Sequence, residues 1–219
     1  MCGRYSITSN FEAVRRLFNL TGPAPNWWQP LYNIAPTEEA PVVRLRDGQP
    51  ELVPLRWGLI PFWAKDEKFG HKTINAKAET VATAPAFREA FVARRCLVVT
   101  DGFYEWQKQG AAKQPWRIGL QDQAPFGLAG LWERWGPRER RLETFTIVTT
   151  EPNALCAPIH NRMPVIIDPA DFPAWLAAAP GSASLLRPFP AERMAAYKVG
   201  SAVGSVRNKG PELILPLPA

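Results

Sequence analysis

The second residue of the chain is a cysteine, within the opening Met1-Cys2-Gly3-Arg4-Tyr5. A small residue after the initiator methionine permits removal of Met1, and Cys2 would then be the mature N-terminus. One residue would carry an α-amine, with a pKa of about 7.7–8.0, beside a thiol with a pKa of about 8.5. The amine can condense with an aldehyde to a Schiff base, and the thiolate can then close a five-membered thiazolidine ring. This opening therefore indicates a nucleophile suited to aldehydes.

A second polar motif is Ile74-Asn75-Ala76-Lys77-Ala78-Glu79, which places an amide and an ammonium two residues apart. If the segment is extended, Asn75 and Lys77 point to the same side. The alternative is an ordinary solvated polar face, and the segment alone does not decide between the two.

Two further side chains could transfer protons. Glu105 follows an apolar run and lies between two aromatic residues, so we expect it to be partly buried. Burial raises a carboxyl pKa towards the range useful for proton transfer, although a structural salt bridge is an equal alternative. His160 lies in Ile159-His160-Asn161-Arg162-Met163-Pro164, and imidazole titrates closest to neutrality. A lone histidine is more often structural, so neither residue identifies a site alone.

The motifs of several other enzyme classes are missing from the sequence. It contains no Cys-x-x-Cys, no histidine pair at ligand spacing and no dense carboxylate cluster, so we expect no metal and no other cofactor. It also lacks a glycine-rich phosphate loop and the hydrolase signature Gly-x-Ser-x-Gly.

Charge and aromatic content favour an anionic partner. The chain has 219 residues, a formal net charge of +6 and nine tryptophans. A basic balance attracts nucleic acid, among other anions, through its long-range field. Most tryptophans should be core or interface anchors, but bases also stack on exposed aromatic rings. Single-stranded nucleic acid is therefore among the candidate partners.

The sequence also bears on the compartment. No apolar stretch of about 18 residues predicts a membrane helix, and no basic region followed by an apolar core predicts a secretory signal. The cysteines number three and are widely spaced, which favours free thiols in a reduced setting. We expect a cytoplasmic protein in which Cys96 and Cys156, in apolar surroundings, are inert core thiols.

Many short strands and a few dispersed helices are expected along the chain. Helices are predicted at 11–18, 86–95 and 169–178, a weaker element at 194–199, and strands at 41–46, 51–59, 96–100, 115–120, 126–132, 142–150 and 164–167. This pattern predicts an α+β fold with a curved, barrel-like, mostly antiparallel sheet and peripheral helices. No repeat or linker divides the chain, so we expect one domain over 1–219 with a core of about 2–215.

In its motifs and in their order along the chain, the sequence resembles the SRAP (SOS response-associated peptidase) family of abasic-site processing proteins. The similarity spans nearly the whole sequence. The stretches that carry it are Met1-Cys2-Gly3-Arg4-Tyr5, Tyr32-Asn33-Ile34-Ala35-Pro36-Thr37, Arg56-Trp57-Gly58-Leu59-Ile60-Pro61, Ile74-Asn75-Ala76-Lys77-Ala78-Glu79-Thr80, Gly102-Phe103-Tyr104-Glu105-Trp106, Ile159-His160-Asn161-Arg162-Met163-Pro164 and Val203-Gly204-Ser205-Val206-Arg207-Asn208.

The resemblance implies the SRAP fold and covalent capture of abasic sites in single-stranded DNA, through a thiazolidine to Cys2, during the response to DNA damage. Carried over by motif, the catalytic residues are Cys2, Asn75, Glu105 and His160, and the residues along the DNA backbone are Arg4, Lys77 and Arg162. Many members have arginine where this chain has Lys77. Lysine keeps the positive charge but lacks the planar bidentate fork.

The residues then suggest a sequence of steps. His160 would donate a proton to the sugar ring oxygen, the Cys2 amine would attack C1′, and Glu105 would move protons as the carbinolamine collapses. Asn75 would orient Cys2. The Schiff base also permits β-elimination, so weak lyase activity is expected. A monomer is expected, and Phe62 or Trp63 would stack on a base unless both rings are core.

Two other functions remain open at this point. The family name records a peptidase, which in the narrow sense means self-removal of Met1. In the broad sense it means an N-terminal-nucleophile hydrolase with Cys2 attacking amides. The third possibility is a non-catalytic single-strand binding module, which gives no reason for a cysteine next to Met1.

Overall fold

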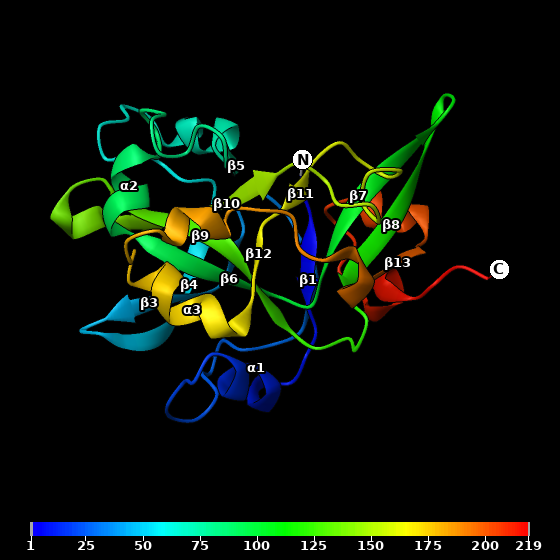
Figure 1. The fold of residues 1–219 in the computed structure, drawn as a ribbon, viewed down its shortest axis with the longest axis horizontal. Helices are drawn as coiled ribbons and strands as arrows, with labels where there is room; N and C mark the ends of the chain where they lie inside the picture. The colour runs from blue at the N-terminus through cyan, green and yellow to red at the C-terminus, as the bar shows by residue number, and fades with distance from the viewer. Residues whose placement is uncertain (1, 219) are drawn as a thin grey trace.

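Two β-sheets form most of the structure, a computed structural model that describes residues 2–218 (Figure 1). The smaller sheet has the order β13-β8-β7-β1-β2. Its strands are β1 (Tyr5–Ile7), β2 (Leu31–Ile34), β7 (Gly102–Gln109), β8 (Ala112–Leu120) and β13 (Met194–Lys198). All its pairings are antiparallel, and β1 at the start of the chain lies between β2 and β7.

The larger sheet closes on itself into a barrel. Its path runs β10-β4-β3-β6-β9, and β9 pairs again with β10. These strands are β3 (Glu39–Arg46), β4 (Gln49–Trp57), β6 (Arg95–Thr100), β9 (Phe126–Trp135) and β10 (Leu142–Thr150), with the short additions β5 (Asn75–Lys77), β11 (Met163–Pro164) and β12 (Ile166–Ile167). Only the pairings of β10 with β4 and β5 are parallel. The predicted α+β fold with a barrel-like, mostly antiparallel sheet is confirmed.

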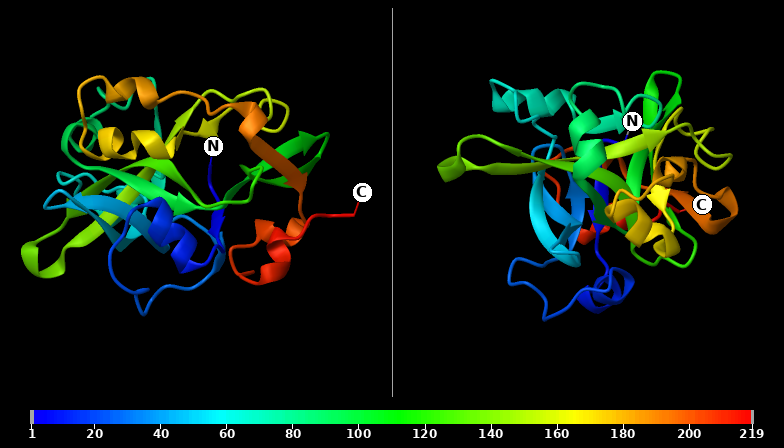
Figure 2. Two further views of the ribbon diagram at one scale, coloured as in Figure 1. Left: turned by 60° about the horizontal axis from the view of Figure 1, so that its bottom comes forward. Right: turned by 60° about the vertical axis from the view of Figure 1, so that its left-hand side comes forward.

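The α-helices are short and peripheral (Figure 2). They are α1 (Phe11–Leu17), α2 (Arg88–Ala93) and α3 (Phe172–Leu176). The predicted start of α1 is confirmed, because the side chain of Asn10 accepts a hydrogen bond from the Ala13 amide at 2.9 Å. The other two are shorter than predicted, and α3 follows a 3-10 turn with proline in its first turn. No helix within residues 2–218 is long and apolar enough to cross a membrane.

The strands predicted at 41–46 and 51–59 form as β3 and β4 and are joined by the turn Asp47-Gly48, where both residues have positive φ, 51° and 77°. Positive φ at both central positions is the two-residue turn that matches strand twist. The weaker element predicted at 194–199 is β13. The prediction missed β7 and the short strands β1 and β2, and gave only a conditional extended reading of β5.

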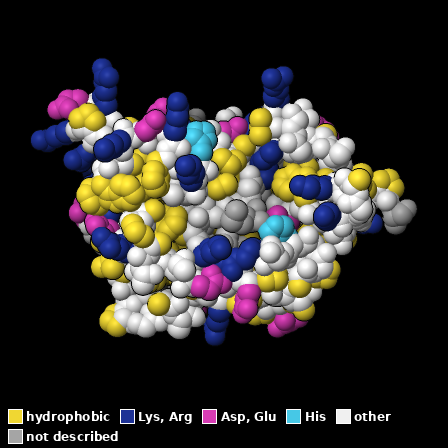
Figure 3. All heavy atoms as spheres, turned by 90° about the horizontal axis from the view of Figure 1, so that it is seen from above, with side chains coloured by type: hydrophobic (Ala, Val, Ile, Leu, Met, Phe, Trp, Pro, Cys, Tyr) yellow, Lys and Arg dark blue, Asp and Glu magenta, His cyan; other side chains and the backbone are white. Residues whose placement is uncertain are grey.

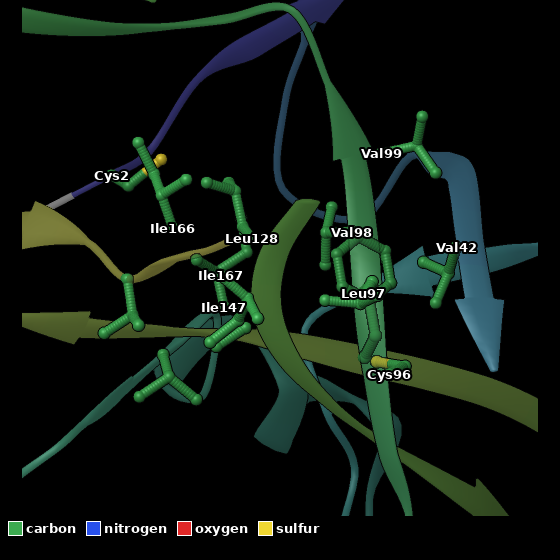
Figure 4. Packing of buried hydrophobic residues seen from close by; sticks show 14 of the residues in the cluster. Cys2, Val42, Cys96, Leu97, Val98, Val99, Leu128, Ile147, Ile166 and Ile167 are labelled. Carbon is green, nitrogen blue, oxygen red and sulfur yellow. The ribbon is translucent and has the colours of Figure 1, made fainter. Parts of the chain in front are cut away.

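The core lies inside and around the barrel, where Trp57, Phe145 and Trp175 are fully buried. Cys2 belongs to the same cluster. Figure 4 shows it in this cluster together with Ile166 and Leu128. Its thiol is thus placed among apolar side chains.

Candidate active site

A buried carboxylate fixes the strand that delivers Cys2. Asp101 follows β6 and accepts hydrogen bonds from the Ser6 hydroxyl at 2.8 Å and from the Ser9 amide at 2.8 Å. The same carboxylate pairs with Arg117 of β8 at 2.8 Å. Because the group is 4% exposed, these bonds replace lost hydration and lock β1 against β7. The position of Cys2 therefore depends on a polar cluster that the sequence analysis did not identify.

Cys2 itself is 0% exposed. Its carbonyl accepts a hydrogen bond from Nδ2 of Asn75 at 2.8 Å. Burial raises the pKa of the Cys2 thiol, and the negative charge of Glu105 raises it further. In this environment the thiol is held neutral until a proton acceptor takes its proton.

Asn75 is brought to Cys2 by the pairing of β5 with β10. Asn75 lies opposite Ile147 in a parallel register, about seventy residues along the chain. The segment is extended, so Asn75 and Lys77 occupy the same side of β5, as predicted. Among the described residues, Oδ1 of Asn75 is buried and has no hydrogen-bond partner. The amide is therefore fixed through its nitrogen, and its oxygen is an unused acceptor.

Glu105 comes from β7 and is 3% exposed. Burial raises its pKa to about 7. The negative charge of Glu105 also raises the pKa values of the Cys2 and Cys156 thiols, so the carboxylate lies near both sulfur atoms. At neutral pH such a group populates both protonation states, which suits it to proton transfer.

His160 follows a series of turns after β10, where its amide bonds to the carbonyl of Cys156 at 2.9 Å. Its Nδ1 lies 3.1 Å from the amide nitrogen of Arg162 and 3.2 Å from the carbonyl oxygen of the same residue. The ring can therefore accept from the amide when neutral and donate to the carbonyl when protonated. Burial lowers the pKa of His160, and Nδ1 lies 4.0 Å from Oε1 of Glu105.

A side-chain relay ties the loop before His160 to β7. Nε2 of Gln107 donates to the carbonyl of Pro158 at 3.0 Å, and Nε1 of Trp116 donates to Oε1 of Gln107 at 3.1 Å. Gln107 is two residues from Glu105, so one strand holds the carboxylate and anchors the histidine loop. Sequence reasoning missed Gln107, whose exposed polar context carries no signal of this role.

Arg162 is paired with a carboxylate. Its guanidinium bonds both oxygens of Glu79, at 2.6 and 3.0 Å, and the carbonyl of Thr149 at 2.6 Å. The Glu79 side chain is 53% exposed, so this fork opens to solvent on one side. Glu79 lies within a recognised motif but had no predicted role.

Arg4 lies differently from a solvent-facing cation. It is buried, and its guanidinium donates to Asn33 at 2.8 Å and to the carbonyls of Val203 at 2.9 Å and Gly204 at 3.3 Å. In this structure it fastens the C-terminal segment to β1 and β2. Its predicted contact with the DNA backbone stays a prediction, and these bonds give it a structural role.

The aromatic pair before η1 (Glu67–Lys72) is on the surface. Phe62 is 54% exposed and Trp63 is 45% exposed, so neither ring is core. Trp63 meets Phe69 edge to face at 5.3 Å, beside a cavity of about 440 Å³ that Lys65, Lys68 and Lys72 also line. Figure 3 views the molecule from above, the side on which Figure 1 places the N-terminus, and shows basic side chains around hydrophobic ones.

The remaining chemistry-bearing groups do not form a second centre. Cys96 and Cys156 are free and buried, and burial raises both thiol pKa values. Within residues 2–218, no group of three or more histidine, cysteine or acidic side chains could hold a metal ion. Lys77 is exposed at the end of β5.

A family model and several known proteins match this chain, and they all point to one family. A family model described as "SOS response associated peptidase (SRAP)" matches residues 1–206. The chain is 42% identical to the abasic site processing protein YoqW of Bacillus subtilis, covering 98% of this chain and 99% of that one. It is 30% identical to YedK of Escherichia coli (99% and 100% covered) and to HMCES of Gallus gallus (99% and 78% covered), both named abasic site processing proteins.

A solved structure has the same fold. It is a protein from Bacteroides thetaiotaomicron with 29% identity and a TM-score of 0.86, covering 99% of this chain and all of that one. Together with the match of the family model over residues 1–206, these similarities show that the chain belongs to the SRAP family.

Proposed function

We propose that this protein recognises abasic sites in single-stranded DNA and bonds to them covalently through Cys2. Its relatives are named abasic site processing proteins, which supports the substrate. The observation that carries the proposal is the convergence at Cys2. Nδ2 of Asn75 donates a hydrogen bond to the Cys2 carbonyl at 2.8 Å. The negative charge of Glu105 raises the pKa of the Cys2 thiol, and Oε1 of Glu105 lies 4.0 Å from Nδ1 of His160.

The reaction begins once Met1 has been removed. The free amine of Cys2 adds to the aldehyde carbon C1′ of the opened sugar, and the carbinolamine loses one water to give a Schiff base. The thiol of Cys2 then adds across the C=N bond, its proton passing to the nitrogen. The thiazolidine forms with loss of one water overall, and its second bond makes the adduct more durable than a Schiff base.

Glu105 and His160 supply the proton movements. With a pKa of about 7, Glu105 can protonate the departing hydroxyl and then take the thiol proton. His160 has a partner for Nδ1 in either protonation state, so it can assist opening of the sugar ring without reorienting. Holding the amine, the thiol and the aldehyde together could raise the rate more than proton transfer by Glu105 or His160, since effective molarities reach about 10⁵ M and above.

The surface around the site suits a single strand. Arg162 and Lys77 would contact phosphates, and Phe62 or Trp63 would stack on a base, each stacked base contributing about 1–3 kcal/mol. Arg4 would join the phosphate contacts only by releasing some of its present bonds. We propose that the protein acts as a monomer in the cytoplasm, associated with the nucleoid when bound to DNA damaged in the SOS response.

Two accessory activities follow from the same residues. The first is self-removal of Met1 after folding, with Cys2 as the nucleophile and Glu105 as the group that moves protons. Weak lyase activity would follow from β-elimination at the Schiff base.

The test is incubation of purified protein with single-stranded DNA that carries one abasic site, followed by a denaturing gel. A shifted band that Cys2→Ala abolishes supports capture. Turnover of peptides without such a band would instead support a general thiol hydrolase.

A further inference from the structure

The hairpin of β7 and β8 extends past the rest of its sheet on the side where the N-terminus lies (Figures 1 and 2). Its outer end carries Lys108 and Lys113, both exposed. No acidic residue lies between Glu105 and Asp122, and Glu105 points to the opposite side of β7 from Lys108, so the lysine face of the hairpin has no counter-charge of its own. The end of the hairpin is therefore a positively charged projection beside the candidate active site.

The two lysines lie directly opposite each other in the antiparallel register of the hairpin. Side chains at such positions share one face with Cβ atoms about 4.5–5.5 Å apart, and like charges there destabilise the pairing. A sequence optimised only for hairpin stability would not pair lysine with lysine. A bound polyanion would remove the repulsion, which favours a ligand at this position.

The hairpin is connected to the site by β7 itself and by side-chain hydrogen bonds. Glu105 precedes Lys108 by three residues on β7, a distance of about 10 Å along the strand. That length equals about three steps of stacked DNA at 3.4 Å each. The bonds of Gln107 to Trp116 and to the Pro158 carbonyl hold the hairpin against the loop that carries His160.

The face of the hairpin that carries the lysines also carries an aromatic ring. Lys108 and Trp106 are two residues apart on β7 and so point to the same side. Trp106 is half-buried, and the guanidinium of Arg4 lies 5.9 Å from its ring. An alternation of cations and an aromatic side chain is typical of surfaces that follow a single strand.

We propose that Lys108 and Lys113 form a second DNA contact, which binds the phosphate backbone of a single strand a few nucleotides from the lesion. This inference rests on the proposed function, because it places the lesion beside Cys2 and Glu105. DNA is favoured over an acidic protein because the lysines share a strand with Glu105 and a face with the aromatic ring of Trp106, on which a base can stack.

The experiment measures non-covalent binding of undamaged single-stranded DNA by the Cys2→Ala protein over a range of salt concentrations. Lys108→Ala/Lys113→Ala in that background should lower the slope of log affinity against log salt by about 1.4, since each contact on a single strand contributes about 0.7. The matched control is Arg138→Ala/Arg140→Ala, which removes the same charge from the exposed turn between β9 and β10. It should leave the slope unchanged. Equal effects of the two pairs would overturn the proposal.

A second variant separates lost binding from lost folding. Lys113→Glu places a carboxylate opposite Lys108, so the melting temperature should stay the same or rise while DNA affinity falls more than in Lys113→Ala. Unchanged affinity in Lys113→Glu would refute the contact. The covalent assay on the wild-type protein is independent of both results. If the wild-type protein fails to crosslink while the lysine substitutions still weaken DNA binding as expected, only the proposed function is refuted.

Discussion

Oε1 of Glu105 lies 4.0 Å from Nδ1 of His160, and burial shifts the two pKa values in opposite directions, so that the order of the two is reversed. The pKa of the carboxyl rises to about 7, and that of the imidazole falls below its ordinary 6.5. Near neutrality the pair therefore includes a protonated acid and a neutral base in the same small space. That combination is what dehydration and ring closure both require.

The pH dependence of crosslinking follows from this pair. The rate should rise as the Cys2 amine loses its proton, with a pKa of about 7.7–8.0, and fall as Glu105 loses its proton above about 7. The wild-type profile should thus be bell-shaped. In Glu105→Gln the falling limb should disappear and the maximum rate should drop. Single-turnover rates across pH 5–9 measure this, and an unaltered bell in the variant would remove Glu105 from the mechanism.

Stability should depend on the same carboxyl. Because its folded pKa of about 7 exceeds its usual value of 4.5, the folded state binds more protons between these pH values, and stability falls as pH rises through that window. The loss is about 3 kcal/mol, and Glu105→Gln should abolish it. Urea unfolding at both ends of the window tests this. Glu139→Gln, at an exposed position, is the control and should keep the wild-type dependence.

Asn75→Ala removes the bond to the Cys2 carbonyl. A hydrogen bond contributes about 0.5–1.5 kcal/mol, so we expect crosslinking to slow by up to about tenfold. Asn10→Ala removes a helix cap and lowers stability by about 1 kcal/mol. It should leave the crosslinking rate unchanged. If both variants slow crosslinking alike, Asn75 acts through stability and not through the position of Cys2.

In the proposed complex, Glu79 would compete with phosphate for Arg162. Its carboxylate already occupies the guanidinium fork at 2.6 and 3.0 Å, and this bond lowers the Glu79 pKa. Glu79→Gln should therefore bind undamaged single-stranded DNA severalfold more tightly at low salt. Glu89→Gln, an exposed carboxylate on α2, controls for net charge. Weaker binding in Glu79→Gln would show instead that the carboxylate holds Arg162 ready for DNA.

The sequence predicted the fold class and most strands of the barrel, because long alternating or apolar segments such as β9 and β10 carry strong periodic signals. It did not predict β1, whose three residues are too few for a pattern. Nor could it show that β5 would pair in parallel with β10, since that pairing joins distant segments. The site residues were named by motif, but their convergence depends on these two strands.

The surroundings of the cationic residues were the least predictable part. Arg4 is held by the carbonyls of Val203 and Gly204, about two hundred residues away, and nothing local indicates them. The Glu79–Arg162 pair spans 83 positions in the same way. Local sequence shows that a side chain is charged, whereas its partner is set by tertiary packing.

The central claim is the ring formed by the nitrogen and sulfur of Cys2. The most direct measurement is the intact mass of the product formed with a single abasic site, without borohydride. We predict a heat-stable adduct equal to the protein without Met1 plus the DNA, minus one water. An adduct that retains Met1, or one that Cys2→Ala forms equally well, would contradict the account.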